Sequence, residues 1–259
     1  MSSRSLKQIL LVGLILFVHL ELFLHFGRFD SLLLLAFFVA VLFLKFRELL
    51  QPALLFLLIH LVVYFPKPLT TLPALPFLVP FFLSILLLLP LLPLRVTLSW
   101  LQKGTLDKTT WLLLILTGLL SSLALIIWAV WSDNLGAGLQ MVQGFSAYPT
   151  WLILSICIPL FALVNAFAEE VVYRGVLQEA LLQIFQVKEW VLLLQAAAFA
   201  AAHFAAGFPN GLIGYVMVFC YGIMLGFLRL RSRGLLAPYL AHVIADLTIG
   251  YCLGWQVLQ

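Results

Sequence analysis

Long apolar stretches, separated by short groups of proline, glycine and charged residues, run through the whole chain. Their apolar residues do not alternate with polar ones, as they would in the strands of a porin-type protein. Stretches that approach about 20 apolar residues can cross the hydrocarbon core of a bilayer as helices. The pattern predicts nine helices, at about residues 8–26, 31–46, 52–65, 73–94, 110–131, 150–184, 190–206, 211–229 and 235–254.

Composition supports the same interpretation. Of the 259 residues, 64% are hydrophobic and 9% are charged, and the mean hydropathy is +1.17. A soluble domain is nearer to half apolar and about a quarter charged. We therefore expect an all-α, polytopic membrane helix bundle with about nine transmembrane helices, or eight if one of the shorter stretches does not cross.

Basic residues are distributed unevenly among the connections between these helices. If the N-terminus is cytoplasmic, the outside connections hold only Arg28 and Lys67, and Arg174 lies within a helix. The inside connections hold the other basic residues, which are Arg4, Lys7, Lys45, Arg47, Arg95, Lys103, Lys108, Lys188, Arg229, Arg231 and Arg233. Because lysine and arginine gather in cytoplasmic connections, we predict a cytoplasmic N-terminus and a C-terminus outside.

Segment 132–149 differs in composition from the apolar stretches on either side. It is rich in glycine and has no lysine or arginine, so we interpret it as a non-cytoplasmic linker. It divides the chain into N-terminal transmembrane helices of unassigned role, residues 1–131, and a second helix bundle, residues 150–259. In the second bundle, ionisable residues recur at helical spacing.

Three ionisable residues lie close together in the helix expected at 150–184. A charged side chain inside a membrane is costly, so such residues usually face the protein interior and mark a functional site. Glu170 and Arg174 are four residues apart with the acid first, which is the favourable order for an ion pair on one helix. Glu169 points about 100° away from Glu170. It is left free of the pair and is a candidate general base.

Two histidines and an aspartate lie in later helices. His203 follows Phe199 by four residues, within an alanine-rich run that allows another helix to approach closely. His242 and Asp246 are also four residues apart, so the carboxylate could orient the imidazole. A histidine held in this way could stabilise negative charge that develops on a carbonyl oxygen.

From the residues alone, several kinds of site remain open. The same buried charges could serve a peptidase or a proton-coupled membrane carrier, although no internal repeat of the transporter kind is visible. Two histidines and two carboxylates could form a zinc site, although no His-Glu-x-x-His helix is present. Taken alone, Glu170 and Arg174 could be only a packing clasp between helices.

Three motifs follow one another in order: Glu-Glu-x-x-x-Arg at 169–174, Phe-x-x-x-His at 199–203 and His-x-x-x-Asp at 242–246. With these motifs, roughly residues 150–255 resemble the CPBP family of CAAX proteases and bacteriocin-processing enzymes. This family is also called the ABI family and consists of intramembrane glutamic endopeptidases. The resemblance implies that residues 150–259 form a catalytic helix bundle like that of a type II CAAX prenyl endopeptidase.

The resemblance also implies roles for individual residues. Glu169 would activate a water molecule that hydrolyses a peptide bond, and His203 would help to hold that water. His242 and Asp246 would form the oxyanion-stabilising side, with Asp246 orienting His242. With the predicted topology, Glu169 is expected in the cytoplasmic half of the membrane, and the site would open to the cytoplasm or laterally to lipid.

Supporting residues and partners follow from the same resemblance. Glu170, Arg174 and Phe199 would support the site. The mechanism would need no metal or cofactor, with zinc as the less favoured alternative. The expected partners are a membrane-tethered protein or peptide substrate and the lipid bilayer, without nucleic acid, in the cell (inner) membrane. A non-catalytic immunity or scaffold protein on the same fold stays open as an alternative.

Overall fold

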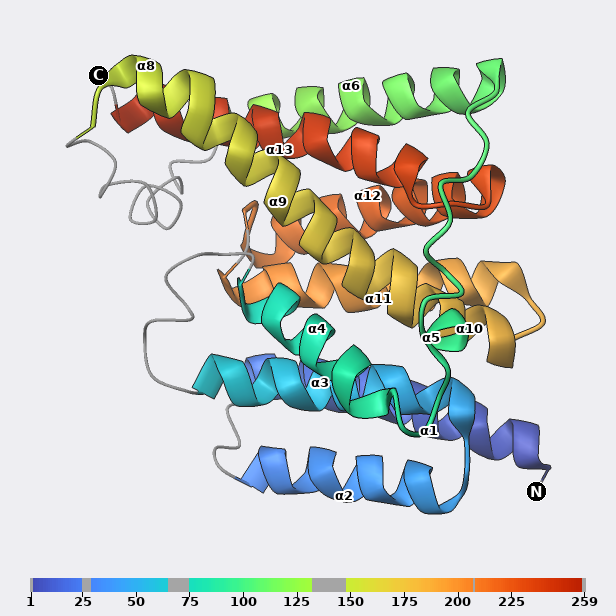
Figure 1. Ribbon diagram of the computed structural model, residues 1–259. Coiled ribbons are helices and arrows are strands. Elements are labelled where there is room, and N and C mark those ends of the chain that lie inside the picture. Colours follow the sequence, from blue (N-terminus) through green and yellow to red (C-terminus); the bar gives the residue numbers. More distant parts are fainter. Residues whose placement is uncertain (1, 25–28, 65–74, 132–147, 207, 258–259) are drawn as a thin grey trace.

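A computed structural model describes residues 2–24, 29–64, 75–131, 148–206 and 208–257 of the chain (Figure 1). Every regular element within these ranges is a helix. Most of the expected linker at 132–149 lies outside the described residues. The elements are α1 (Ser3–Leu24), α2 (Phe29–Phe43), α3 (Arg47–Tyr64), α4 (Leu75–Leu88), α5 (Leu94–Thr97), α6 (Lys108–Trp131), α8 (Thr150–Leu152), η3 (Ile153–Cys157), α9 (Ile158–Glu170), η4 (Val171–Leu177), α10 (Gln178–Ile184), α11 (Lys188–Ala206), α12 (Gly211–Ser232) and α13 (Leu236–Val257).

Each of the nine expected helices has a counterpart among these elements, and most differences are at their ends. The helix α4 stops at Leu88, before Pro90 and Pro93, because the residue before a proline disfavours helical geometry. The short helix α5 follows, and the sequence pattern did not separate it from α4. The helix α12 continues past the expected end to Ser232, where Arg233 adopts a left-handed conformation with φ of 56°.

Four of the described helices are long and apolar enough to cross a membrane. They are Lys108–Trp131, Thr150–Ile184, Gly211–Ser232 and Leu236–Gly254, and two shorter apolar helices are Asp30–Phe43 and Leu78–Leu88. Their outer faces carry large apolar side chains, such as Leu119, which is 61% exposed. An apolar exterior of this extent is matched by lipid and not by water. The protein is therefore an all-helical integral membrane protein.

Basic side chains tie several helices together at one end of the bundle. The helix α1 begins at this end, and the connections α2–α3, α10–α11 and α12–α13 also lie there (Figure 1). The α11–α12 connection lies at the other end. The contacts at the basic end are Arg4 Nε to the Ile184 carbonyl at 3.1 Å, Lys7 to Glu48 at 2.7 Å, Arg229 to Glu179 at 3.5 Å and Arg231 to Asp107 at 2.7 Å.

The two halves of the chain share one interior. The main apolar core joins residues of α1, α3 and α4 to residues of η4, α10 and α11. The helix α6 packs instead on α12 and α13, where Leu114 lies with Leu225, Leu228, Ala237 and Ala241. The N-terminal helices therefore surround the C-terminal bundle on two sides.

The helix from Thr150 to Ile184 is continuous but widens twice into π-helical turns, at Ile153–Cys157 and Val171–Leu177. Short π-helical segments inside α-helices are often found at functional sites. In the second segment, Gly175 packs directly on the buried ring of Trp100. A β-carbon at Gly175 would lie 2.7 Å from Cε3 of that ring. Because residue 175 is glycine, Trp100 in the connection before α6 can pack directly against the π-helical segment.

We predict that Gly175→Ala destabilises the protein by about 1 to 3 kcal/mol, because the new methyl group overpacks the contact with Trp100. The free energy of unfolding in detergent, measured by chemical denaturation, would test this. The matched control is Gly13→Ala in α1, where a β-carbon meets no atom within 4 Å. Equal unfolding free energies for the two variants would contradict the packing argument.

Candidate active site

Three helical segments bring the candidate residues together. The helix α9 supplies Glu169 and Glu170 at its C-terminal end, and Arg174 follows in η4. The other two segments are α11, with Phe199 and His203, and α13, with His242 and Asp246. All the residues selected from the sequence therefore face one another across the interior of the bundle.

Arg174 is fully buried, with no exposed surface. Its Nη1 atom lies 3.1 Å from Glu170 Oε1, which confirms the ion pair expected from their spacing. Its guanidinium carbon lies 4.2 Å from the ring centroid of Phe199, in a cation–π arrangement. The buried cation is thus balanced by one carboxylate and one aromatic face.

Glu170 makes a second contact that the sequence did not predict. His242 Nδ1 lies 2.8 Å from Glu170 Oε1, whereas His242 Nε2 lies 3.6 Å from Asp246 Oδ1. The first distance is a hydrogen bond and the second is too long for one. The group that orients the imidazole is therefore Glu170, and not Asp246 as we expected.

Glu169 lies where the imidazole groups of two helices converge. Its Oε2 atom is 3.5 Å from His242 Nε2 and 4.0 Å from His203 Nε2. This oxygen is buried and has no hydrogen-bond partner among the described residues. At separations of 3.5 to 4.0 Å, a water molecule can bridge the Glu169 oxygen and the histidine nitrogens. The second oxygen, Oε1, accepts a hydrogen bond from Asn165 Nδ2 at 3.2 Å.

Phe199 is the aromatic centre of the site. Its ring lies 4.6 Å from the ring of His203 and 5.8 Å from that of His242, edge-on in both cases. The backbone oxygen of Phe199 lies 2.9 Å from His203 Nδ1. If that nitrogen carries the proton and donates to this oxygen, Nε2 of His203 is free to interact with the space near Glu169.

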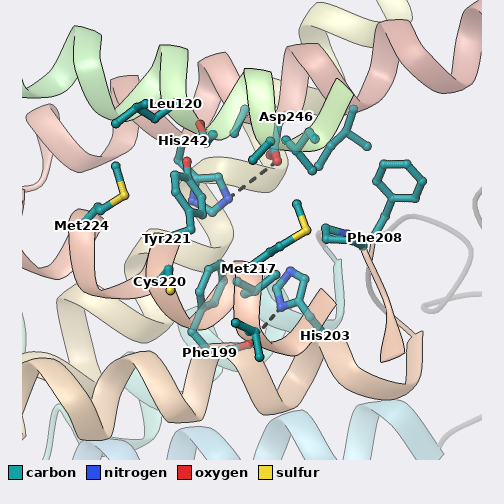
Figure 2. Close-up of a pocket in the computed structure, with 18 residues that line it drawn as sticks. Leu120, Phe199, His203, Phe208, Met217, Cys220, Tyr221, Met224, His242 and Asp246 are labelled. Atoms are coloured by element: carbon teal, nitrogen blue, oxygen red, sulfur yellow. Dashed lines mark hydrogen bonds and ion pairs between the residues drawn. The ribbon is translucent and has the colours of Figure 1, made fainter. Parts of the chain in front are cut away.

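A cavity of about 290 Å³ adjoins the two histidines (Figure 2). His203, His242 and Asp246 contribute its polar lining, and α6, α12 and the α11–α12 connection contribute apolar side chains. Figure 2 shows Leu120 and Met224 toward one end of this space and Phe208 toward the other. Glu169 does not line the cavity, so the two imidazoles stand between it and the open space.

No metal site is recognisable by geometry in the part of the chain that the structure describes. Within it, no group of three or more histidine, cysteine, aspartate or glutamate side chains is arranged to hold an ion. The mechanism without metal stays a prediction.

Sequence reasoning missed two polar residues of the site. Asn165 Nδ2 lies 3.2 Å from both Glu169 Oε1 and Asp246 Oδ2, so it links α9 to α13. The ring of Tyr221 is perpendicular to that of His242 at 5.6 Å. Asn165 could have been found, because it is a buried polar residue four positions before Glu169 on the same helix face.

Comparison with known proteins identifies the same region. Residues 149–248 match the family model described as type II CAAX prenyl endopeptidase Rce1-like. No curated protein and no solved structure matches the chain. The matched segment contains every candidate residue named above, and the resemblance inferred from the three motifs is confirmed. Residues 149–248 of the chain are therefore similar to the Rce1-like family of type II CAAX prenyl endopeptidases.

Proposed function

We propose that this protein is an intramembrane, metal-independent glutamic endopeptidase that hydrolyses a peptide bond in membrane-anchored or prenylated protein or peptide substrates. The observation that carries the proposal is the position of Glu169 Oε2, which is buried, without a hydrogen bond, and faced by Nε2 atoms of two histidines. A carboxylate that faces two imidazoles in a nonpolar interior suits general base catalysis.

In the proposed reaction, a water molecule is held by Glu169 and His203 beside the cavity. Glu169 removes a proton as the water oxygen attacks the carbonyl carbon of the substrate. The proton is then passed to the amide nitrogen, the carbon–nitrogen bond breaks, and a carboxylate and an amine are released. No covalent enzyme intermediate is formed.

His242 would stabilise the oxyanion of the tetrahedral intermediate. Its Nδ1 hydrogen is donated to Glu170 at 2.8 Å, which fixes the orientation of the ring. Donation from Nε2 to the oxyanion then requires the doubly protonated imidazolium, which carries a hydrogen on each nitrogen. Asp246, held by Asn165 at 3.2 Å, would lie beside this cation and complete the same side of the site.

We also propose that about nine helices, or eight if one of the shorter ones does not cross, span the cell (inner) membrane, with a cytoplasmic N-terminus and the C-terminus outside. The basic end of the bundle, where Arg4, Lys7, Arg229 and Arg231 form their contacts, supports this orientation. The cytoplasmic connections of helices α1–α4 and those of the C-terminal catalytic bundle would then lie at the same end of the protein.

We predict that purified protein cleaves membrane-tethered reporter peptides, and that Glu169→Gln and His203→Ala lower the turnover number by roughly 10²- to 10⁴-fold, the usual contribution of general acid–base catalysis. A panel of reporters would be incubated with each protein in the presence and absence of a strong zinc chelator. Mass spectrometry of the products would measure turnover.

Each outcome of this experiment points to a different mechanism. Cleavage that resists the chelator and is lost in both variants is the expected result. Cleavage lost to chelator and restored by zinc would make these residues metal ligands. Variants as active as the wild type would overturn the assignment of the site, and a folded protein that cleaves no reporter would favour the carrier or scaffold functions.

We predict that Glu170→Ala lowers stability as well as activity, because it leaves the buried Arg174 cation without its carboxylate and removes the hydrogen bond to His242. Breaking a buried pair in this way costs about 3 to 5 kcal/mol. The matched control is Glu48→Ala, which removes the partly exposed ion pair with Lys7 and should cost about 0 to 1 kcal/mol. Unfolding in detergent would compare the two, and similar losses would contradict the bracing role of Glu170.

A further inference from the structure

Two carboxylates of the candidate site share one hydrogen-bond donor. Asn165 Nδ2 lies 3.2 Å from Glu169 Oε1, one turn further along α9, and 3.2 Å from Asp246 Oδ2 on α13. An amide nitrogen carries two hydrogens, so it can donate one to each oxygen. Among the described residues, no other group lies within hydrogen-bond distance of either carboxylate as a donor. Asn165 is 8% exposed, so the amide is buried together with the two acids.

The two partners also fix which end of the amide faces them. An ionised carboxylate only accepts hydrogen bonds, and the side-chain oxygen of asparagine also only accepts. If the amide were turned around, Asn165 Oδ1 would face two acceptors with no hydrogen between them. The nitrogen of Asn165 therefore faces Glu169 and Asp246.

The other oxygen of each acid faces a single imidazole. Glu169 Oε2 lies 3.5 Å from His242 Nε2, and Asp246 Oδ1 lies 3.6 Å from the same nitrogen. Glu169 Oε2 also lies 4.0 Å from His203 Nε2 and has no hydrogen-bond partner among the described residues. The two oxygens of each acid thus have different surroundings, because one is held by Asn165 and the other faces the histidine side of the site.

This difference determines which oxygen of Glu169 can receive a proton. An oxygen that accepts a hydrogen bond from an N–H group already has a hydrogen in the position that a proton would take. Oε1 is occupied in this way by Asn165, whereas Oε2 has no such partner among the described residues. A proton that Glu169 removes from water is therefore placed on Oε2, on the side of the acid that faces the histidines.

We propose that Asn165 is a positioning residue for the hydrolytic reaction. Its amide holds Glu169 Oε1 and Asp246 Oδ2, so that the proton taken from water is received on Glu169 Oε2 and is passed from that atom to the amide nitrogen of the substrate. The amide also places a donor between two like charges, which would otherwise repel each other in a nonpolar interior. This inference rests on the proposed function and assigns a further residue to that same site.

The crossing of α9 and α13 has other contacts besides this amide. The hydroxyl group of Tyr239 donates a hydrogen bond to the carbonyl of Leu163 at 3.2 Å. Gly250 packs so closely on α9 that a β-carbon would lie 2.6 Å from Ile158 Cγ2. We therefore expect variants of Asn165 to fold. Tyr239→Phe is the matched control, because it removes one hydrogen bond between the same two helices without touching either carboxylate.

Two variants separate hydrogen-bond donation from shape. Asn165→Leu removes the donor and fills a similar volume, whereas Asn165→Asp keeps the shape but cannot donate to two ionised carboxylates. With a membrane-tethered reporter at neutral pH, both should lower the turnover number by about 10- to 100-fold, the effect of losing a hydrogen bond to a charged group. KM should stay within about twofold, because the lost interaction acts on the chemical step. Wild-type turnover in Asn165→Asp would overturn the proposal.

An infrared measurement tests the contact without any cleavage. The carbonyl band of a protonated carboxylic acid moves to lower frequency when its carbonyl oxygen accepts a hydrogen bond. The Glu169 band is obtained at low pH as the difference between a protein and its Glu169→Gln variant. We expect this band at lower frequency with Asn165 present than in the Asn165→Leu protein, because Asn165 bonds to Oε1 while the proton is on Oε2. Equal frequencies would overturn the proposal.

The outcomes separate this inference from the proposed function. If the wild type cleaves the reporter and Asn165→Leu cleaves it as fast as Tyr239→Phe does, the positioning role is wrong and the peptidase function stands. If a folded wild type cleaves no reporter, the peptidase function fails, and the infrared band alone decides whether Asn165 holds Oε1. Unfolding in detergent is measured for every variant. If Asn165→Leu is less stable than Tyr239→Phe and its KM rises as turnover falls, Asn165 has a structural role only.

Discussion

A buried positive charge is the constraint on which the arrangement of this site depends. Arg174 has no exposed surface, and an uncompensated cation in that position would be too costly to keep. Glu170 at 3.1 Å and the face of Phe199 at 4.2 Å compensate it. The same Glu170 oxygen accepts the hydrogen bond from His242. The Glu170 carboxylate of α9 therefore joins η4 to α13 and fixes the imidazole that faces Glu169, and Arg174 extends the connection to Phe199 of α11.

Close helix packing keeps these polar groups in place. Gly222 of α12 approaches Ala196 of α11, where a β-carbon would lie 3.1 Å from the Ala196 backbone. The amide of Gln195 donates a hydrogen bond to the carbonyl of Gly222 at 2.7 Å. Inside a membrane, small residues and interhelical hydrogen bonds take the place of the hydrophobic effect in holding helices together. The geometry of the candidate site thus depends on residues that have no part in the proposed chemistry.

The helix α6 gives the cavity a wall that lies outside the family match. The match covers residues 149–248, whereas Leu120, Ser121, Ala124 and Leu125 belong to the N-terminal part of the chain. The residues of the proposed chemistry therefore lie within the matched segment, and one wall of the cavity is built by a helix outside it. Such a division would allow proteins with the same hydrolytic residues to differ in substrate preference.

Sequence by itself determined the helices, the membrane setting, the family resemblance and the Glu170–Arg174 pair, because these depend on hydropathy and on the spacing of residues along the chain. The contacts between helices were decided by the tertiary structure. Nothing in the spacing of Glu170 relates it to His242, and Asn165 reaches Asp246 only because α9 and α13 cross there. The cavity was equally hidden, since Leu120 and Leu119 look alike in a sequence, and only the position of α12 decides which one lines the cavity.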